Sequence, residues 1–286
     1  MIVAKDVKQL DEALHEARLK NKTIGLVPTM GALHQGHLSL MEQAKKTCDI
    51  LVVSIFVNPT QFGPGEDFES YPRQLEVDSK LAAEANCDVL FCPAEEVMYP
   101  DGPTQLVHVR QGADVLCGAR RPGHFDGVAT VVLKLLSLVG PHKAFFGQKD
   151  AQQLAIIKQL TKEFFLPVSI IGCPTVREED GLAKSSRNVY LTPQERAMAP
   201  TLYNALQSAA QSGERQLKKL VSMVENELSI LPIGSIDYVE AYEYPSLKSV
   251  DYVEGTVILA VAYQFSKARL IDHILIEFTN RNRGEA

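Results

Sequence analysis

Two histidines three residues apart, His34 and His37, are the side chains of this sequence best suited to contacting phosphate. On a helix this spacing places both imidazole rings on one side, where their N–H groups could donate to phosphate oxygens. A zinc site would need a third and a fourth ligand, and neither an HExxH pattern nor a cysteine pair stands nearby. Spacing alone leaves a phosphate-contacting pair and two ordinary surface histidines equally open. The glycine-containing sequence His34-Gln35-Gly36-His37, which follows a predicted strand, favours phosphate.

The elements around this pair predict a phosphate-binding turn. Residues 23–27 form a short apolar run that indicates a buried parallel strand, and residues 38–46 indicate a helix. A strand, a glycine-containing turn and a helix N-terminus bring free backbone N–H groups and the positive end of the helix dipole to one place. Gly31 and Gly36 would let a ligand approach the backbone closely. We therefore expect residues 28–37 to form the centre of the functional site.

The next predicted strand ends near a carboxamide. Residues 49–57 are largely apolar and β-branched, so the two strands and the helix that connects them form a right-handed βαβ unit. Ligands of such sheets bind beyond the carboxyl ends of the strands, and here residues 58–62 follow directly. The Gln61 carboxamide can both donate and accept, which suits a hydroxyl beside a carboxylate. These residues by themselves nevertheless favour a proline-containing turn with a solvated Gln61.

Three further segments carry groups that suit a nucleotide. A predicted strand at residues 143–146 ends at residues 147–150, where an aspartate could accept from ribose hydroxyls and a glycine would admit the nucleotide. Residues 184–187 place two hydroxyls and two cations in four positions, which suits a phosphate clamp, and a polar linker between domains is the alternative. The basic run at residues 118–125 is equally open between a phosphate-facing loop and a solvated turn.

The apolar patterns predict an α/β fold in two parts. Residues 1–175 are expected to form a Rossmann-like parallel sheet domain, and residues 176–286 a smaller α+β domain that closes over it. In the first domain, a helix capped by Asp6 precedes the first strand, residues 63–73 form a flexible loop, and residues 106–109 form a short strand. The second domain is expected to hold two helices and three strands, at residues 193–211, 214–230, 236–240, 256–262 and 269–278.

The composition argues against several classes of protein. A net charge of −6 over 286 residues does not suit a nucleic-acid-binding protein. No apolar run reaches the ~18 residues of a membrane helix, and the N-terminus lacks the apolar region of a signal peptide. The five cysteines are odd in number and contain no CxxC pair, which indicates reduced thiols. We therefore expect a globular protein of the cytoplasm.

The string from Pro28 to His37 resembles the signature of the pantothenate synthetase family. Its last four residues are similar to the HIGH-type motif of nucleotidylyltransferases and class I aminoacyl-tRNA synthetases, and residues 184–187 resemble their KMSKS-type loop. The resemblance covers essentially the whole chain. It implies an ATP-dependent ligase that joins pantoate to β-alanine. The pantoate carboxylate first attacks the α-phosphorus to give pantoyl adenylate and pyrophosphate, and the β-alanine amine then displaces AMP.

The resemblance also implies which residues form the site. The expected ATP contacts are Met30, Gly31, Ala32, Leu33, His34, Gln35, Gly36, His37, Gly147, Gln148, Lys149, Asp150, Val176, Lys184, Ser185, Ser186 and Arg187. The expected pantoate contacts are Met30, Gln61 and Gln153, and Gln61 is also expected to contact β-alanine. The expected catalytic residues, which neutralise charge on the phosphates, are His34, His37, Lys149 and Arg187. Magnesium is expected with ATP but without a dedicated protein cage, Asp78 and Asp150 being only candidates. A homodimer is implied, with no nucleic-acid or membrane partner.

Two other functions remain open from the sequence. A nucleotidylyltransferase of the same superfamily would need basic residues in its acceptor pocket in place of Gln61 and Gln153, and a nucleotide-binding module without catalysis should lack some of the donors found here. One residue departs from the family pattern, because Lys184 stands where a methionine is usual. A lysine that points into solvent and a third cation that reaches the β- and γ-phosphates are equally open.

Overall fold

The computed structural model describes residues 1–250 and 255–278. The chain divides into two compact units, the first made of residues 1–110 and 121–176 and the second of residues 111–120 and 177–286. Residues 111–120, which lie within the range 1–175 expected for the first domain, thus group with the second unit. The end of the expected second domain, residues 279–286, lies outside the described residues.

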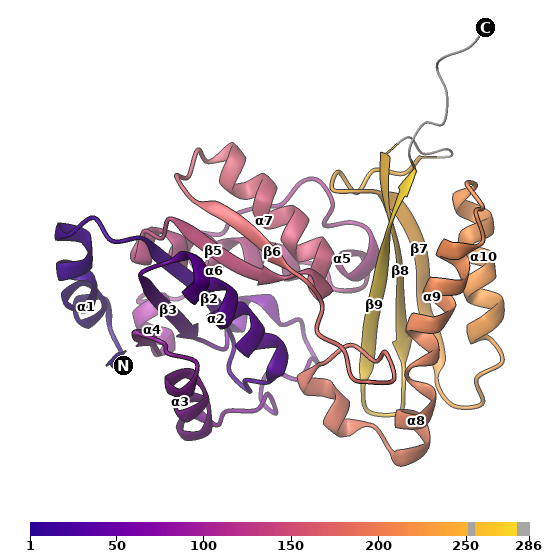
Figure 1. The fold of residues 1–286 in the computed structure, drawn as a ribbon, viewed down its shortest axis with the longest axis horizontal. Helices are drawn as coiled ribbons and strands as arrows, with labels where there is room; N and C mark the ends of the chain where they lie inside the picture. The colour runs from indigo at the N-terminus through magenta and orange to yellow at the C-terminus, as the bar shows by residue number, and fades with distance from the viewer. Residues whose placement is uncertain (251–254, 279–286) are drawn as a thin grey trace, which may run out of the picture. The chain divides into compact units, whose positions relative to one another are not determined.

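The first unit contains a parallel sheet in the order β1-β4-β3-β2-β5-β6, which confirms the predicted Rossmann-like fold (Figure 1). The strands are β1 Ile2–Ala4, β2 Ile24–Thr29, β3 Ile50–Ile55, β4 Val89–Phe91, β5 Lys143–Gly147 and β6 Ser169–Cys173. The central strands are buried on both faces and rich in Val, Ile and Leu, as expected where helices cover both sides of a sheet.

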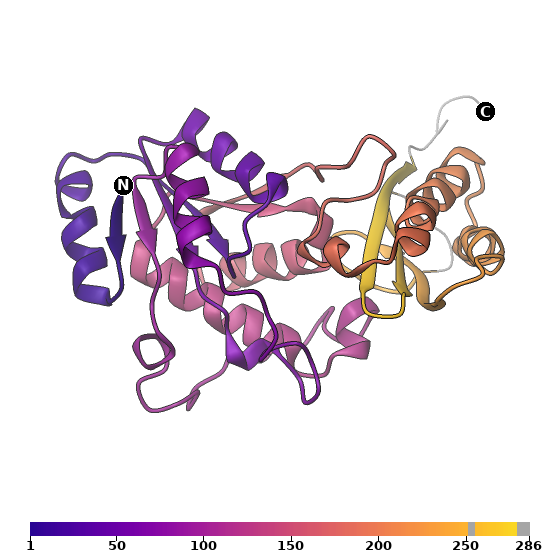
Figure 2. The ribbon, with the colours of Figure 1, turned by 90° about the horizontal axis from the view of Figure 1, so that it is seen from below.

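The helices of this unit lie on both faces of the sheet (Figure 2). The α-helices are α1 Val7–Leu19, α2 Gln35–Thr47, α3 Leu75–Glu84, α4 Glu95–Met98, α6 His124–Val139 and α7 Ala151–Glu163, and the 3₁₀ turns are η1 Pro59–Gln61 and η2 Gln148–Asp150. Crossovers between parallel strands are right-handed, and the direction of strand addition reverses at β2. This reversal places α2 and α3 on one face and α1, α6 and α7 on the other.

The reversal creates a switch point between β2 and β5. These strands pair only at Gly25 with Lys143 and at Leu26 with Ala144, whereas β2 pairs with β3 as far as Thr29. Pro28, which has no N–H, stands in the central strand beyond the last pairing with β5, where a proline is tolerated. The segments that follow β2 and β5 therefore leave the sheet side by side, at the position where such folds bind ligands.

Two predictions for this unit are wrong in detail. A strand, β1, precedes α1, so the helix capped by Asp6 is not followed by the first strand of the sheet but by the second. Residues 106–109 form no strand, because side chains of α6 satisfy their backbone donors. Thr130 Oγ1 accepts from Val107 N–H at 2.8 Å, and Asp126 Oδ1 accepts from Val109 N–H at 2.8 Å. The cap itself is confirmed, since Asp6 accepts from Gln9 N–H at 2.8 Å.

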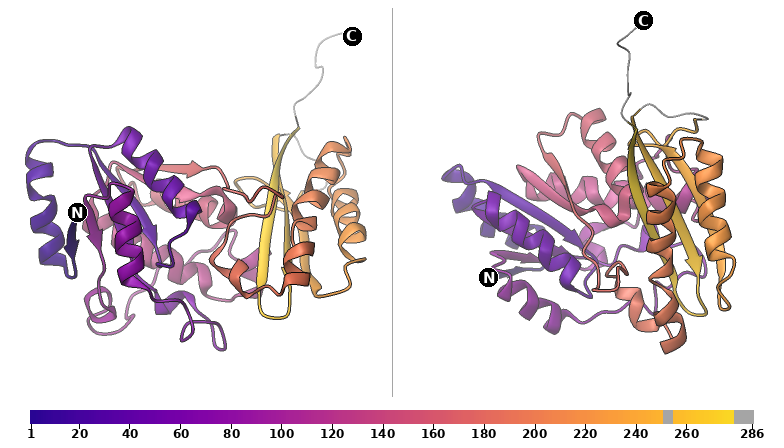
Figure 3. Two further views of the ribbon diagram at one scale, coloured as in Figure 1. Left: turned by 60° about the horizontal axis from the view of Figure 1, so that its bottom comes forward. Right: turned by 45° about the vertical axis from the view of Figure 1, so that its right-hand side comes forward.

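The second unit is a three-stranded antiparallel sheet with helices against it (Figure 3). Its elements are α5 Leu116–Arg120, η3 Ser186–Tyr190, α8 Pro193–Met198, α9 Thr201–Gln211, α10 Leu217–Leu228, β7 Ser235–Glu243, β8 Gly255–Gln264 and β9 Arg269–Phe278. The three predicted strands are confirmed. The predicted helix at 193–211 is wrong, because it is broken into α8 and α9 around Pro200, which cannot donate a helical hydrogen bond.

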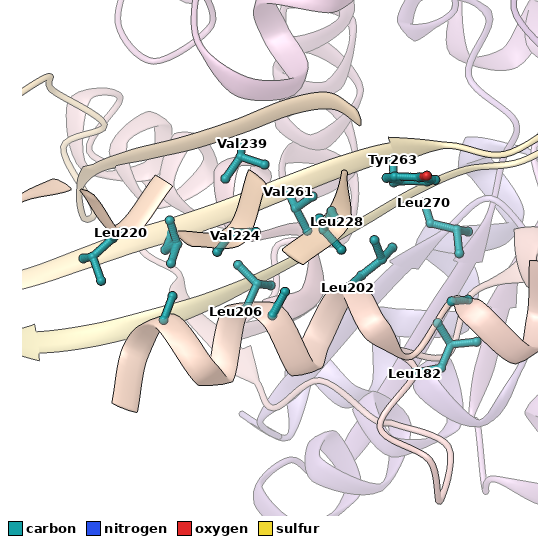
Figure 4. Close-up of a cluster of buried hydrophobic side chains, with 14 of the residues drawn as sticks. Leu182, Leu202, Leu206, Leu220, Val224, Leu228, Val239, Val261, Tyr263 and Leu270 are labelled. Carbon is teal, nitrogen blue, oxygen red and sulfur yellow. The ribbon is translucent and has the colours of Figure 1, made fainter. Parts of the chain in front are cut away.

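Alternate residues of β8 form the core of the second unit. Val257, Leu259, Val261 and Tyr263 belong to one buried cluster, as the period of two in a strand requires. Leucines and valines of α9 and α10 belong to the same cluster, and Figure 4 labels Leu202, Leu206, Leu220, Val224 and Leu228 among them. Packing of this face fixes the register of the sheet, because a slip of one residue would turn every one of these side chains away from α9 and α10.

Helix α5 is attached to β7 through polar contacts. Glu240 Oε2 accepts from Leu116 N–H at 3.1 Å, Cys117 Sγ lies 3.3 Å from Tyr238 Oη, and Arg120 pairs with Asp237 at 3.2 Å. The prediction of a loop at residues 118–125 is therefore wrong, since α5 and the start of α6 occupy most of this run.

Among the helices that the structure describes, none is long and apolar enough to cross a membrane.

Candidate active site

A buried aspartate shapes the turn that follows β2. Asp78, in the first turn of α3, is 1% exposed, and its Oδ2 and Oδ1 accept from Ala32 N–H at 3.0 Å and from Leu33 N–H at 2.8 Å. Gly31 N–H donates to Thr29 Oγ1 at 3.2 Å. The prediction of free backbone N–H groups in this turn is therefore wrong for residues 31–33. Asp78 is also poorly suited to binding a metal, because both of its oxygens already accept backbone hydrogen bonds.

The two histidines form the cap of α2. His34 is the N-cap residue, and its Nδ1 accepts from Gly36 N–H at 3.1 Å, while His37 Nδ1 accepts from His34 N–H at 3.3 Å. The ring centroids are 4.1 Å apart. In a neutral imidazole one nitrogen accepts and the other donates, so these contacts place the proton of each ring on Nε2. The sequence prediction of two donors side by side is thus matched by the geometry.

His37 is held in its neutral form. Burial, followed by the neighbouring His34 and Lys149, lowers the pKa of His37 to about 3, and Asp150 acts in the opposite direction. Because α2 contacts β5, the segment after β5 lies near this helix, as the switch point requires. A phosphate at this place would meet the N–H dipole of an uncharged His37, beside the ammonium group of Lys149.

Gln61 is buried and oriented, so the interpretation as a solvated turn residue is wrong. Its side chain is 8% exposed, and its Oε1 accepts from Asn58 Nδ2 at 3.2 Å. This contact turns Nε2 toward Met30, whose sulfur lies 3.0 Å away. Asn58 is itself fully buried, and its Oδ1 accepts from Tyr99 Oη at 2.8 Å. Met30 and Gln61, both expected to contact pantoate, are thus brought together.

Helix α6 packs closely against the segment that carries Gln61. A Cβ atom at Gly127 would meet the carbonyl oxygen of Thr60 at 2.2 Å, so only glycine allows this approach. Gly127 O also accepts from Asn58 Nδ2 at 3.1 Å. His124 Nδ1 lies 2.7 Å from the backbone oxygen of Gln61. Burial, followed by the charge of Arg121, lowers the pKa of His124 to about 4.

The basic residue at the start of this helix is paired. Arg121 donates from Nε and Nη2 to both carboxylate oxygens of Glu66, at 2.7 and 2.6 Å. Burial opposes ionisation of Glu66, but the guanidinium of Arg121 holds the pKa of the carboxyl below its usual range. Arg121 therefore fastens the loop at residues 63–73, which was predicted to be flexible, and its charge is already matched.

The segment after β5 contributes both charged and amide groups. Lys149 Nζ lies 3.8 Å from Asp150 Oδ1, whose side chain is 51% exposed. Gln152 and Gln153 stand in the first turn of α7, with Gln152 buried and Gln153 half-buried. These residues therefore follow the strand predicted at residues 143–146, as expected from the sequence. In the part of the chain that the structure describes, no three His, Cys, Asp or Glu side chains are grouped to hold a metal.

The KMSKS-like segment, residues 184–187, belongs to the second unit, and the chain just before it is held there by Arg177. Arg177 donates to both oxygens of Asp272 at 2.6 and 2.9 Å, and its guanidinium stacks 3.5 Å from the centre of the Tyr203 ring. Lys184 Nζ lies 3.1 Å from Glu178 Oε2, so the interpretation as a lysine pointing into solvent is wrong. Ser185 Oγ accepts from Arg187 N–H at 3.2 Å and caps η3.

Sequence reasoning assigned no role to Asn58, which orients Gln61, or to Tyr99, which contacts Asn58. It considered His124 only as part of the basic run at residues 118–125, and Asp78 only as a metal ligand. Asn58 follows a predicted strand directly, and that position was the one available signal for it. The contacts of Tyr99 and His124 join residues 41 and 63 positions apart, respectively, which no local pattern indicates.

Comparisons with known proteins agree with this geometry. A sequence model of the family "Pantoate-beta-alanine ligase" matches residues 2–275. The chain is 68% identical over 284 residues to the pantothenate synthetase of Shouchella clausii, covering 99% of this chain and 94% of that protein.

Solved structures give the same result. The pantothenate synthetase of Thermus thermophilus superposes with a TM-score of 0.88 at 44% identity, covering 96% of this chain and 99% of that one. The Francisella tularensis pantoate-beta-alanine ligase, described as complexed with beta-gamma ATP and beta-alanine, has a TM-score of 0.80 at 39% identity, covering 96% and 97%. The parallel sheet, the paired histidines after β2 and these matches over nearly the whole chain place the protein in the pantoate-beta-alanine ligase family.

Proposed function

We propose that the protein joins pantoate to β-alanine at the expense of ATP, through a pantoyl adenylate. The observation that carries the proposal is the pair of Nε2–H donors of His34 and His37, fixed by their own helix cap at the switch point of the sheet. The relatives named above support the choice of substrates, and the ligands named for the Francisella protein support ATP and β-alanine.

In the first step, the pantoate carboxylate attacks the α-phosphorus of ATP, and the bond to the bridging oxygen of pyrophosphate breaks. Negative charge moves toward the phosphates as this happens. His34, His37 and Lys149 donate to those oxygens, and because they are already in place they stabilise the transition state without reorganisation. Met30, Gln61 and Gln153 hold pantoate in the orientation that attack requires.

In the second step, the β-alanine amine attacks the acyl carbon of the adenylate, AMP leaves with the electron pair of the acyl–oxygen bond, and the amine loses a proton. Gln61 contacts β-alanine as well as pantoate. Its amide is neutral and both its ends can bind, so it tolerates a carboxylate and an amine in turn. Tight packing of η1 against α6 at Gly127 keeps this amide in one place.

The remaining phosphate contacts are assigned to the KMSKS-like segment. Ser185, Ser186 and Arg187 supply hydroxyl donors and a planar cation, which suit the charge of a leaving pyrophosphate. Lys184 would add a fourth contact if it exchanged Glu178 for a phosphate oxygen. Backbone groups of residues 147–150 and Val176 complete the proposed nucleotide contacts.

Magnesium is proposed to arrive with ATP, on its phosphates. Its chemistry there would be to neutralise the triphosphate and to make pyrophosphate a better leaving group. Asp150 is the better of the two candidate ligands, because its carboxylate is half-exposed, whereas both oxygens of Asp78 are occupied by backbone donors. A single side chain of this kind suits a metal held mainly by substrate.

A homodimer in the cytoplasm completes the proposal. Family membership supports the homodimer, and the five cysteines, which are not joined in disulfides and three of which are buried, support a reducing compartment. Light scattering of the purified protein tests the dimer, which should show twice the mass of 31.5 kDa.

ATP–pyrophosphate exchange tests the reaction itself. We expect exchange that requires pantoate and does not require β-alanine. Exchange without pantoate would mean that the adenylyl group passes to another acceptor, as in a nucleotidylyltransferase, and no exchange with pantoate would mean that the protein does not adenylate pantoate; either result would overturn the proposed ligase. The side chain of Gln61 contacts two neutral side chains, those of Asn58 and Met30, which argues against the first alternative because an acceptor phosphate would need cations there.

A further inference from the structure

The carboxylate of Asp78 occupies a place in which related turns bind anionic ligands. Residues 30–33, here named the signature turn, contain two consecutive left-handed residues, Gly31 with φ 83° and Ala32 with φ 49°. Successive N–H groups in such a turn converge and form a concavity for an anion. In this structure the anion is internal, since Asp78 accepts from Ala32 N–H and Leu33 N–H.

Ala32 needs this partner more than a glycine would. A side chain with a Cβ atom is strained in the left-handed region, whereas glycine is not. Two hydrogen bonds that the backbone donates to the buried Asp78 carboxylate oppose that strain, and charge-assisted bonds of this kind are stronger than neutral ones. The third contact of Asp78, from Gln74 Nε2 to Oδ1, is longer at 3.4 Å and does not involve the turn.

The turn leads directly into the histidine cap. Leu33, whose N–H is held by Asp78, is followed by His34, the N-cap residue of α2. The direction in which both imidazole rings enter the site is therefore set by the conformation of Ala32 and Leu33. No side-chain contact of Asp78 with either histidine is needed for this effect.

We propose that Asp78 is a positioning residue of the ligase reaction, which holds the signature turn in its left-handed conformation and so aims the Nε2–H donors of His34 and His37. The proposal rests on the proposed function of the two histidines. It assigns Asp78 a task different from binding magnesium, since both of its oxygens are directed at the protein backbone.

Asp78→Asn is the first variant to make. It keeps the shape of the side chain but can accept at only one atom, and its NH₂ group faces one of the two backbone donors. We expect pantoate-dependent exchange to fall by about 10²-fold, mainly in kcat, which is the size of effect that misplaced catalytic groups produce. Gln74→Ala is the matched control, because it removes the third contact and leaves the turn untouched, and exchange should stay within twofold of wild type.

A double-mutant cycle with Ala32→Gly separates positioning from mere stabilisation. Glycine adopts the left-handed conformation without strain, so it should reduce the need for Asp78. We expect the loss caused by Asp78→Asn to be about tenfold smaller in the Ala32→Gly background, since left-handed strain of an L-residue has about this effect on a population. An equal loss in both backgrounds would overturn the proposal, because Asp78 would then not act through Ala32.

Two further measurements keep the outcome clear. The magnesium concentration that gives half-maximal exchange should be unchanged in Asp78→Asn, and a large increase would show a metal ligand instead. Nitrogen-15 shifts of the His34 and His37 rings should change in Asp78→Asn and not in Gln74→Ala, and unchanged shifts would count against the proposal.

The histidine shifts also test the proposal if wild type shows no exchange or if Asp78→Asn does not fold. If wild type shows no pantoate-dependent exchange, the proposed function fails, while the histidine shifts still test Asp78. If Asp78→Asn does not fold, Asp78→Glu is the second variant, since it keeps both acceptor oxygens but displaces them. It should show the same histidine shift changes, and their absence in a folded Asp78→Glu protein would overturn the proposal.

Discussion

His37 Nδ1 accepts a hydrogen bond from the backbone N–H of His34 at 3.3 Å. The ring of His37, in the first turn of α2, thus binds the backbone of His34, the N-cap residue of the same helix. In the same way, Nδ1 of His34 accepts a hydrogen bond from the backbone N–H of Gly36. Each ring therefore uses one nitrogen to build the helix start, and the tautomer directs the proton of each to Nε2. Structural and chemical roles are thus divided between the two nitrogens of one ring.

Replacement of His37 should affect both roles, to different extents. We expect His37→Ala to lose adenylation by about 10²–10³-fold, which is typical when one charge-stabilising donor is removed. Loss of the cap should lower the free energy of unfolding by only about 1 kcal/mol. Asp6→Ala, which removes the cap of α1, is the matched control and should show the second effect without the first. Wild-type exchange in His37→Ala would rule out the phosphate contact.

Acid should destabilise the protein through the half-buried His37 and His124. The folded pKa values of His37 and His124, about 3 and about 4, lie below the ordinary value of 6.5, so the unfolded chain binds more protons. Stability is therefore fully present above pH 6.5 and is lost as pH falls through the window between 6.5 and these values, by at most about 1.4 kcal/mol per pH unit for each histidine.

Urea unfolding across this window measures the effect. We expect the fall in unfolding free energy to be less steep in His124→Asn than in wild type. Replacement of His15, an exposed histidine of α1, is the control and should leave the slope unchanged. Parallel slopes in all three proteins would mean that His124 is not held neutral by the fold.

Gln61→Glu should separate the two substrates. A carboxylate at this buried position would face the pantoate carboxylate and would lose the donor end of the amide. We expect pantoate binding to weaken by about 10²-fold or more, since a buried unpaired charge costs several kcal/mol, with ATP binding little changed. Gln43→Glu makes the same chemical change on an exposed position of α2 and should alter neither. An equal loss of ATP affinity would show that Gln61 has been assigned to the wrong ligand.

Lys184 and Glu178 offer a test of the KMSKS-like segment. If Lys184 reaches the phosphates, Lys184→Met should raise the KM for ATP and weaken its dependence on salt, because salt screens exposed charges. Glu178→Gln removes the competing partner and should lower the KM for ATP, but only while Lys184 is present. Pantoate affinity should not change in either variant. Titrations that give one ATP curve for all the proteins at low and high salt would reduce Lys184 to a structural ion pair.

The ion pair at the base of this segment should matter for stability. Asp272 is 4% exposed and pairs with Arg177 through two hydrogen bonds, so Asp272→Ala leaves a largely buried guanidinium without its partner. We expect a loss of about 3–5 kcal/mol in the free energy of unfolding. Asp180→Ala breaks the exposed pair with Arg196 and should cost less than about 1 kcal/mol. Similar small losses in both variants would mean that the buried pair contributes little.

The sequence predicted what local patterns determine. The apolar run that became β2, the helix that became α2 and the cap of α1 at Asp6 all depend on residues close together in the chain. The strand expected at residues 106–109 failed because side chains of α6, far along the chain, satisfied its backbone donors.

In the candidate site, too, features that depend on nearby residues could be predicted, whereas features that depend on distant contacts could not. The spacing of His34 and His37 predicted that the two rings lie on one side, but histidine is not a usual capping residue, so the cap could not be foreseen. The role of Asp78 depends on a contact 46 residues away, and the burial of Gln61 depends on Asn58, Tyr99 and Gly127 acting together. Contacts of this kind exist only once the sheet has formed.

The attachment of α5 to β7 has a consequence for synthesis on the ribosome. Leu116 and Cys117 are translated more than a hundred residues before their partners Glu240 and Tyr238, from which they are separated by 124 and 121 positions. The second unit cannot be completed until β7 has emerged, whereas every strand of the first sheet is available by residue 173. Vectorial synthesis therefore favours a first unit that matures while α5 remains an unpaired insertion, and a fragment that begins at residue 177 would lack one of its own helices.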